Sequence, residues 1–202
     1  IIHMATKTYH HGDLKNALIK AGVEILAKEG IGKLSLRKVA LKAGVSHTAP
    51  YAHFSDKQSL IAAISTEGFQ RLSKALDAAM KSHANNPKKQ LIEGAQAYVK
   101  FALANKDIFK IMFSSVLEKE KEYPAFVEIS QKTFHQVVKI VEACQEAGII
   151  KSGEADVLAV IIWGQVHGII ALAIEGQISH TVLEKKSLQE IITQAVEQAI
   201  KK

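Results

Sequence analysis

The residues from Ser46 to Lys57 carry many short polar side chains that suit contacts to nucleic acid. Hydroxyl, imidazole and ammonium groups can donate hydrogen bonds to phosphate oxygens, whereas small side chains leave room for the edges of bases. We therefore expect two sets of contacts. Phosphate contacts are expected from Ser35, Arg37, Ser46, Tyr51, His53 and Lys57, and base-edge contacts from His47, Thr48, Ala49 and Pro50.

The base-edge set has a composition that favours one kind of base pair. Arg37 is the one arginine among the first 57 residues, and it lies outside the segment that would face bases. The arginine fork that reads guanine is therefore missing there. Ala49, Pro50 and the methyl group of Thr48 suit thymine methyl groups better. The sequence predicts a DNA site whose contacted steps are A·T.

These side chains need a scaffold, and residues 35–54 predict two short helices joined by a tight turn. Ser35 is a suitable N-cap, and Leu36, Val39 and Ala40 share one apolar face. Gly44 can end the first helix in a left-handed conformation. Ser46 would cap a second short helix that begins at His47. This spacing is typical of a helix-turn-helix, although a helical hairpin in an ordinary bundle has the same pattern.

The same residues resemble a known family. The run Ala43-Gly44-Val45-Ser46, followed by Tyr51, His53-Phe54, Lys57 and Leu60, resembles the signature of the tetracycline-repressor (TetR) family. The similarity runs from about Tyr9 to Leu60. Thr48 and Pro50 depart from the usual pattern, which has glycine and an aliphatic residue at these places. The departures affect the expected base preference rather than the expected DNA binding.

A second stretch extends the resemblance to the C-terminal part. Trp163-Gly164-Gln165-Val166-His167-Gly168 resembles the Trp-His-Gly motif of one TetR branch, and the segment TYHHGDLK at residues 8–15 resembles the same branch. The resemblance implies a three-helix DNA-binding domain at residues 9–60, with its helix-turn-helix at 35–54. It implies a ligand-binding and dimerisation domain at residues 61–202, and about nine helices in all.

Composition and charge agree with this division. The chain has 202 residues, 48% of them hydrophobic, and three prolines, and its apolar residues recur at helical spacing, which predicts an all-α fold. Residues 1–57 hold nine Lys and Arg against four Asp and Glu, whereas residues 58–202 hold seventeen against sixteen. A basic N-terminal part beside a nearly neutral body favours nucleic-acid binding at one end. The single cysteine, Cys144, is expected to be buried, and it fits a cytoplasmic protein.

Three helix starts can be predicted from capping residues. Ser55 with Gln58 three residues later forms a possible capping box before a long helix that links the DNA-binding part to the body. Ser187 with Glu190 forms another before the last helix. Ser152 is expected to cap the apolar helix between them.

That apolar helix has two possible environments. The stretch Val157–Ile174 has no charged residue over eighteen positions, which is the lower limit for a membrane span. Gln165 and His167 lie in its middle, however, and the centre of a soluble bundle has the same composition. The family pairs its last two helices with those of a second subunit, so the resemblance implies a homodimer through Val157–Ile174 and Leu188–Ile200.

Aromatic residues and methionine are concentrated in the body and could line a cavity for an apolar small molecule. The same side chains at helical spacing could simply form a core. The candidates are Phe101, Phe109, Met112, Phe113, Phe134, Trp163 and His167.

No motif in the chain predicts an enzyme. The sequence lacks His-Glu-x-x-His, a phosphate-binding glycine loop and Gly-x-Ser-x-Gly, and it has no Glu-x-x-His pair of a di-iron bundle. We expect no catalytic residue, no metal and no cofactor. The prediction is a DNA-binding transcriptional regulator, a repressor that a small apolar ligand releases from a near-palindromic operator. An all-α enzyme and a membrane-associated helical protein are the alternatives.

Overall fold

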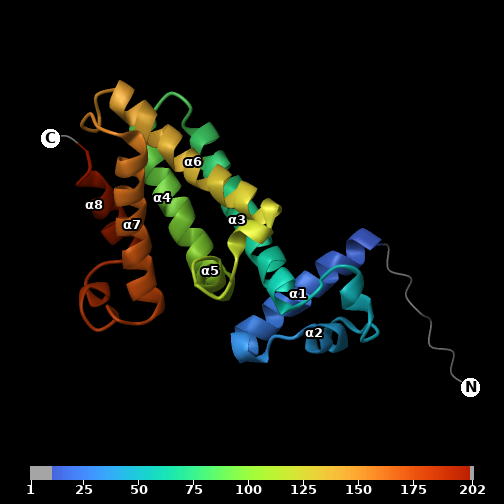
Figure 1. The fold of residues 1–202 in the computed structure, drawn as a ribbon. Helices are drawn as coiled ribbons and strands as arrows, with labels where there is room; N and C mark the ends of the chain where they lie inside the picture. The colour runs from blue at the N-terminus through green and yellow to red at the C-terminus, as the bar shows by residue number, and fades with distance from the viewer. Residues whose placement is uncertain (1–10, 201–202) are drawn as a thin grey trace, which may run out of the picture.

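The computed structural model describes residues 11–200, and over this range the chain is helical, with one isolated antiparallel bridge between Ile150 and Ile200. Figure 1 shows an elongated molecule with a small N-terminal group of helices at one end and a larger helical body at the other. The α-helices are α1 (His11–Glu29), α2 (Leu36–Ala43), α3 (Lys57–Ser82), α4 (Pro87–Ala104), α5 (Lys106–Met112), α6 (Pro124–Glu146), α7 (Ala155–Ile174) and α8 (Leu188–Glu197). The all-α prediction is confirmed.

Helices α1 and α2 and the start of α3 form the N-terminal group, which we call the head. Leu36, Val39 and Ala40 of α2 are buried, as their spacing predicts. Leu36 and Val39 belong to the same hydrophobic core as Leu18 of α1 and Leu60 of α3. Four short 3-10 turns join the elements, of which η1 (Ile31–Lys33) and η2 (Ala49–Ala52) lie in the head.

Helix α3 begins one residue later than predicted. Asp56, not Ser55, is its N-cap: the Asp56 carboxylate accepts a hydrogen bond from the backbone N–H of Ser59 at 2.7 Å, and the Ser59 hydroxyl accepts one from the backbone N–H of Asp56. The predicted box of Ser55 and Gln58 was therefore wrong, because a carboxylate and a hydroxyl one residue further on make the reciprocal pair. The Gln58 amide is left free to bond elsewhere.

Helix α3 continues without a break from the head into the body, across the predicted domain boundary at residue 60. Gly68 of α3 lies close against α5. A Cβ atom there would lie 2.4 Å from the Met112 sulfur and 2.6 Å from Cγ2 of Ile108. Only glycine fits this contact, so α3 and α5 are held together where the body begins.

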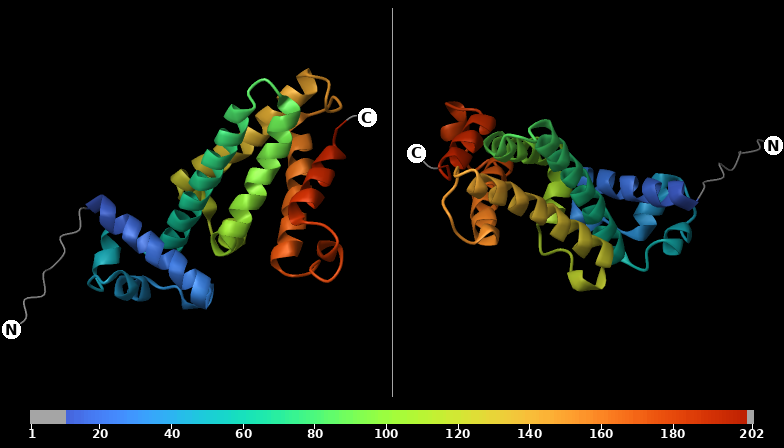
Figure 2. Two further views of the ribbon diagram at one scale, coloured as in Figure 1. Left: turned by 180° about the vertical axis from the view of Figure 1, so that it is seen from behind. Right: turned by 90° about the horizontal axis from the view of Figure 1, so that it is seen from above.

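In the body, α3, α4 and α6 lie side by side, with α7 and α8 on the side away from α3 (Figure 2). The predicted capping box of Ser187 and Glu190 is confirmed at the start of α8. Ser152 does not cap α7. The N-cap residue is Glu154, whose side chain makes no capping hydrogen bond. Cys144 is buried as predicted, and burial raises the pKa of its thiol to about 11.

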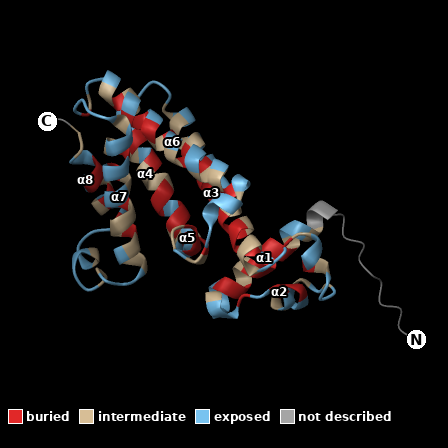
Figure 3. Ribbon diagram, viewed as in Figure 1, coloured by how far each residue is buried: buried red, intermediate tan, exposed pale blue. Residues whose placement is uncertain are grey.

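Helix α7 has two apolar faces. Ala159, Ile162, Val166 and Ile170 are buried against the body, whereas the opposite face is largely exposed (Figure 3). By length and composition α7 could cross a membrane, a test that core helices of soluble proteins also pass, and only 22% of its most apolar window is buried. The exposed apolar residues of α7 are Val157, Val160, Ile161 and Leu172.

Candidate DNA interface and ligand cavity

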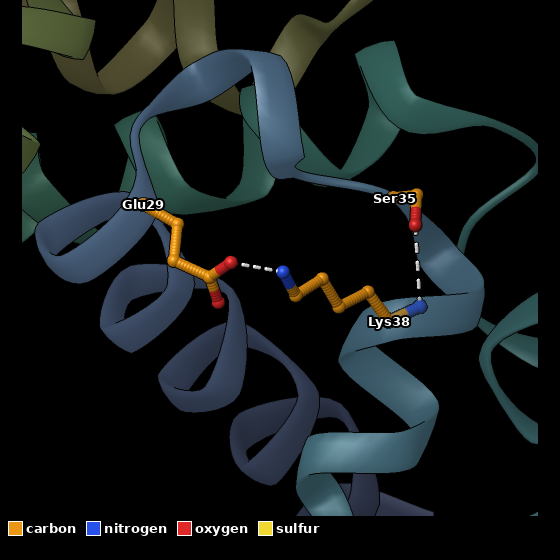
Figure 4. Close-up of polar contacts among 3 residues, drawn as sticks. All are labelled: Glu29, Ser35 and Lys38. Atoms are coloured by element: carbon orange, nitrogen blue, oxygen red, sulfur yellow. Dashed lines mark hydrogen bonds and ion pairs between the residues drawn. The ribbon is translucent and has the colours of Figure 1, made fainter.

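Helix α2 is fixed to α1 at both ends. Figure 4 shows the Ser35 hydroxyl accepting a hydrogen bond from the backbone N–H of Lys38 at 3.2 Å, which caps α2. The Lys38 ammonium forms an ion pair with Glu29 of α1. Because Ser35 accepts a bond here, its exposed hydroxyl keeps a proton that can be donated to a phosphate oxygen.

The other end of α2 turns as the sequence predicts. Gly44 has φ 70°, the left-handed conformation, and its N–H bonds the carbonyl of Leu41 at 3.2 Å. Lys42 forms an ion pair with Glu24 of α1 at 2.8 Å, which lowers the pKa of that carboxyl. Two of the basic groups of α2 are thus used within the head, while Arg37 remains exposed.

The second element of the helix-turn-helix is shorter than predicted. Residues 47–48 form a turn, and the helical part is the 3-10 helix η2, so the prediction of a helix beginning at His47 was wrong. Ser46 does not cap it: the Ser46 and Thr48 hydroxyls lie 3.2 Å apart and bond each other. Pro50 lies in the first turn of η2, where its missing N–H has no helical partner to lose.

The residues of the predicted base-edge set do not all lie on the surface. His47 and Thr48 are exposed and Ala49 is half-buried, but Pro50 is buried. The neighbouring Tyr51, which belongs to the predicted phosphate contacts, is 61% exposed. The Pro50 ring packs inward because it closes the turn against the core of the head. The surface available to bases therefore consists of the other small and polar side chains, with Tyr51 beside them.

Lys57 and His53 are less free than the sequence indicates. The Lys57 ammonium donates to the backbone carbonyl of Ile31 at 2.8 Å and so holds η1 against the start of α3. Two of its protons remain for other acceptors. His53 is half-buried, and its Nε2 atom is buried without a hydrogen-bond partner in the described part of the chain.

Sequence reasoning missed one candidate on this surface. Leu41 of α2 is 72% exposed, although it is a large apolar residue. It follows Arg37 by four residues, so both lie on the outer face of α2. The sequence did contain a signal: Leu41 is a large apolar residue that does not share the helix face of Leu36, Val39 and Ala40.

The body encloses a cavity of about 600 Å³ between α3, α4, α5, α6 and α7. Its wall is mostly apolar and aromatic. Of the predicted lining residues, Met112, Phe113, Phe134 and Trp163 line it, whereas Phe101, Phe109 and His167 lie outside the lining. The sequence did not point to Phe69, Tyr98 and Phe126, which also line the cavity.

Tyr98 of α4 is the centre of a polar network in the cavity wall. The Trp163 indole N–H donates to the Tyr98 oxygen at 3.1 Å, and that oxygen lies 2.8 Å from Nδ1 of His167. If the tyrosine proton is donated to Nδ1, the indole N–H and the phenol O–H both have partners, and the neutral imidazole carries its own proton on Nε2. Burial lowers the pKa of His167, which favours that form, and it raises the pKa of Tyr98.

His167 packs behind the cavity wall. Its ring stacks on Phe109 with centroids 5.2 Å apart and meets the edge of Phe113 at 4.8 Å. Because Phe113 lines the cavity, His167 and Phe109 support the wall from behind. No group of three or more His, Cys, Asp or Glu residues that could hold a metal ion occurs within residues 11–200.

Gln58 joins the cavity wall to the head. Its amide nitrogen donates to the backbone carbonyl of Val116 at 3.1 Å, and its amide oxygen accepts from the backbone N–H of Glu118 at 3.0 Å. Both partners belong to the loop after α5, which contributes Ser114, Ser115 and Glu120 to the cavity lining. The first turn of α3 is therefore bonded to a loop that a bound molecule would touch.

Comparisons with known proteins agree with this architecture. Residues 18–64 match the family described as "Bacterial regulatory proteins, tetR family", and residues 91–196 match "Tetracyclin repressor-like, C-terminal domain". The second description does not name the Trp-His-Gly branch, which stays a prediction. A curated relative, the uncharacterized HTH-type transcriptional regulator YvkB of Bacillus subtilis (strain 168), is 26% identical over 157 residues, which are 73% of this chain and 78% of that protein.

Solved structures show the same fold. A protein of unknown function from Rhodococcus sp. RHA1 is 33% identical, with 96% of each chain covered and a TM-score of 0.79. The fatty acid degradation regulator FadR from Bacillus halodurans is 15% identical, with 96% of this chain and 97% of that chain covered and a TM-score of 0.74. Its likeness concerns the fold alone. The chain therefore belongs to the TetR family and is a DNA-binding transcriptional regulator.

Proposed function

We propose that the chain acts in the cytoplasm as a homodimeric repressor that a small apolar molecule releases from a near-palindromic operator. The observation that carries the proposal is the Gln58 bridge between the head and the loop that borders the cavity. A molecule that moves this loop also acts on the first turn of α3. By linkage, the molecule weakens DNA binding only to the extent that it binds more tightly to an arrangement of the heads that does not fit the operator.

The outer face of α7 supports a dimer. Val157, Ile161 and Leu172 are between 47% and 58% exposed, which is unusual for a row of large apolar residues on one helix. Gly164 and Gly168 lie between them, and a Cβ atom at either would meet nothing within 4 Å. A second copy of α7 can approach these glycines closely, and α8 lies beside α7 to complete a four-helix interface.

In this proposal the two heads contact half-sites one helical turn apart, or a multiple of it. Ser35, Arg37, Ser46, Tyr51, His53 and Lys57 bind phosphates. His47, Thr48 and Ala49 face base edges and favour A·T steps, with no contribution from the buried Pro50 ring.

The experiment that tests the proposal begins with selection of genomic DNA fragments by the purified protein. We expect recovery of a two-fold symmetric sequence with A·T at its contacted steps. An asymmetric site bound by a single subunit would contradict the dimeric arrangement. A symmetric site whose essential contacts are all G·C would contradict the base-edge assignment alone.

A further inference from the structure

Three of the four serine and threonine hydroxyls in the cavity lining are already used as donors. The side chains of Ser114, Ser130 and Thr133 each donate to a backbone carbonyl three or four residues earlier, at 3.1, 2.9 and 2.7 Å. A hydroxyl whose proton is engaged has only lone pairs left to offer. Towards a molecule in the cavity, these three groups act as hydrogen-bond acceptors.

Tyr98 and Trp163 likewise offer a ligand no hydrogen-bond donor. The indole N–H of Trp163 is taken by the Tyr98 oxygen, and the tyrosine proton is directed at Nδ1 of His167. Neither ring has a donor left for a ligand, whereas the Tyr98 oxygen keeps acceptor capacity. The faces of these rings, together with those of Phe69, Phe113, Phe126 and Phe134, carry the negative side of the aromatic quadrupole.

The charge of the cavity lining is also negative. Glu120 is the one charged residue in the cavity lining of the described chain, and no Lys, Arg or His lines it. Lys119 lies next to Glu120 in sequence but pairs with Glu122 at 3.5 Å. The polar residues of the lining that keep free donors, Ser115 and Gln131, are exposed, as Glu120 is, so the donors and the carboxylate all lie at the rim of the cavity.

We propose that the cavity binds an apolar amine in its ammonium form, with the ammonium group at Glu120 and the apolar part among the aromatic rings. The inference rests on the proposed ligand-responsive function and names the chemical class of the ligand. Aromatic faces and a carboxylate both attract a cation, and the acceptor oxygens can take its N–H protons. A carboxylate ligand would find no cation in the lining and would meet the like charge of Glu120.

The test uses three probes that share one apolar part and differ in charge: 4-phenylbutylamine, 4-phenyl-1-butanol and 4-phenylbutyrate. Trp163 is the single tryptophan of the chain and lines the cavity, so its fluorescence reports on occupancy. Titration of the full-length protein at neutral pH should show the amine binding about tenfold or more tightly than the carboxylate, with the alcohol between them. An equal or higher affinity for the carboxylate would overturn the proposal, as would failure of the amine to bind.

A charge-matched pair of variants locates the effect. Glu120→Gln should reduce the affinity for the amine about threefold to tenfold and leave the affinity for the alcohol within about twofold. Glu118→Gln removes the same charge two residues away, outside the cavity lining, at an exposed side chain that forms no ion pair in the described part of the chain, and it should leave both affinities nearly unchanged. Equal effects of the two variants would contradict the role of Glu120.

This test is independent of the proposed function. Amine binding that leaves operator affinity unchanged would refute release by a ligand and keep the ligand class. Operator release by a different compound, with no binding of the amine, would refute the ligand class and keep the repressor.

Discussion

The head and the cavity use their polar groups in opposite ways. The outer surface of the head keeps free donors, including the guanidinium of Arg37, the exposed hydroxyl of Ser35 and the phenol of Tyr51. The cavity uses three of its four serine and threonine hydroxyl protons within its own wall and has Glu120 as its charged residue. A donor-rich basic surface suits a polyanion, whereas an acceptor-rich cavity suits a cation. The two regions of one chain thus select partners of opposite charge, and the Gln58 bridge lies between them.

The largest effect is expected from breaking the proposed dimer, in which two heads bind one DNA. Ile161→Glu puts a charge on the exposed apolar face of α7 and should convert the dimer to a monomer in light-scattering measurements. Operator affinity should then fall about 100-fold or more, because the second head no longer binds as part of the same molecule.

Gln70→Glu is the matched control, since it adds the same charge at an exposed polar position of α3, a helix outside the proposed interface. An Ile161→Glu protein that stays dimeric with full operator affinity would show that the proposed interface is elsewhere.

The next effect concerns the donors of the head. Lys57→Ala should weaken binding to all DNA sequences about threefold to tenfold and reduce the slope of log affinity against log salt by about one, because one phosphate contact is lost. Lys100→Ala, which removes an exposed lysine of α4, should change neither quantity.

Lys57 also bonds the carbonyl of Ile31, so thermal unfolding of both variants has to be compared. A change in sequence preference with an unaltered salt slope would contradict the phosphate role of Lys57.

A smaller effect is expected at the connection between the two regions. Gln58→Ala removes the bonds to Val116 and Glu118 and should leave operator affinity without ligand within about twofold. The loss of operator affinity caused by saturating 4-phenylbutylamine should become about threefold smaller, because part of the coupling free energy passes through this amide. Gln70→Ala, at an exposed position of α3, is the control. Unchanged coupling in Gln58→Ala would show that the bridge is only structural.

The smallest effect is a pH dependence from the cavity wall. Burial lowers the pKa of His167, so the unfolded imidazole takes up a proton at higher pH than the folded one. The free energy of unfolding should therefore fall as the pH drops below about 6.5, the ordinary value for histidine. His167→Gln should lessen this fall, measured by denaturant unfolding at neutral and mildly acidic pH. Parallel pH profiles for the two proteins would contradict a neutral, half-buried His167.

The sequence predicts the head better than the cavity. Ser35, Gly44 and the apolar spacing of α2 act over a few residues, so their effects are visible in the chain itself. The start of α3 was missed by one residue because Ser55 and Asp56 are both good caps. Pro50 was placed on the surface because local reasoning shows that it can begin a helical turn, but not which side of the turn packs against the core.

The cavity depends on contacts between residues far apart in sequence. Trp163 and His167 were identified as a pair, yet only the structure shows that Tyr98 lies between them and that His167 lies behind the wall. Tyr98 precedes His167 by 69 residues, and no local pattern connects them. The donor and acceptor roles of the lining likewise follow from hydrogen bonds that exist only in the folded helices.

The measurement that tests the account most directly is a titration of labelled operator DNA with the full-length protein, followed by fluorescence anisotropy, with and without saturating 4-phenylbutylamine. Trp163 fluorescence in the same samples shows whether the cavity is occupied. The account predicts that occupancy by the amine weakens operator binding by at least about fivefold, the lower end of ordinary coupling between sites. Full occupancy of the cavity with unchanged operator affinity would contradict it.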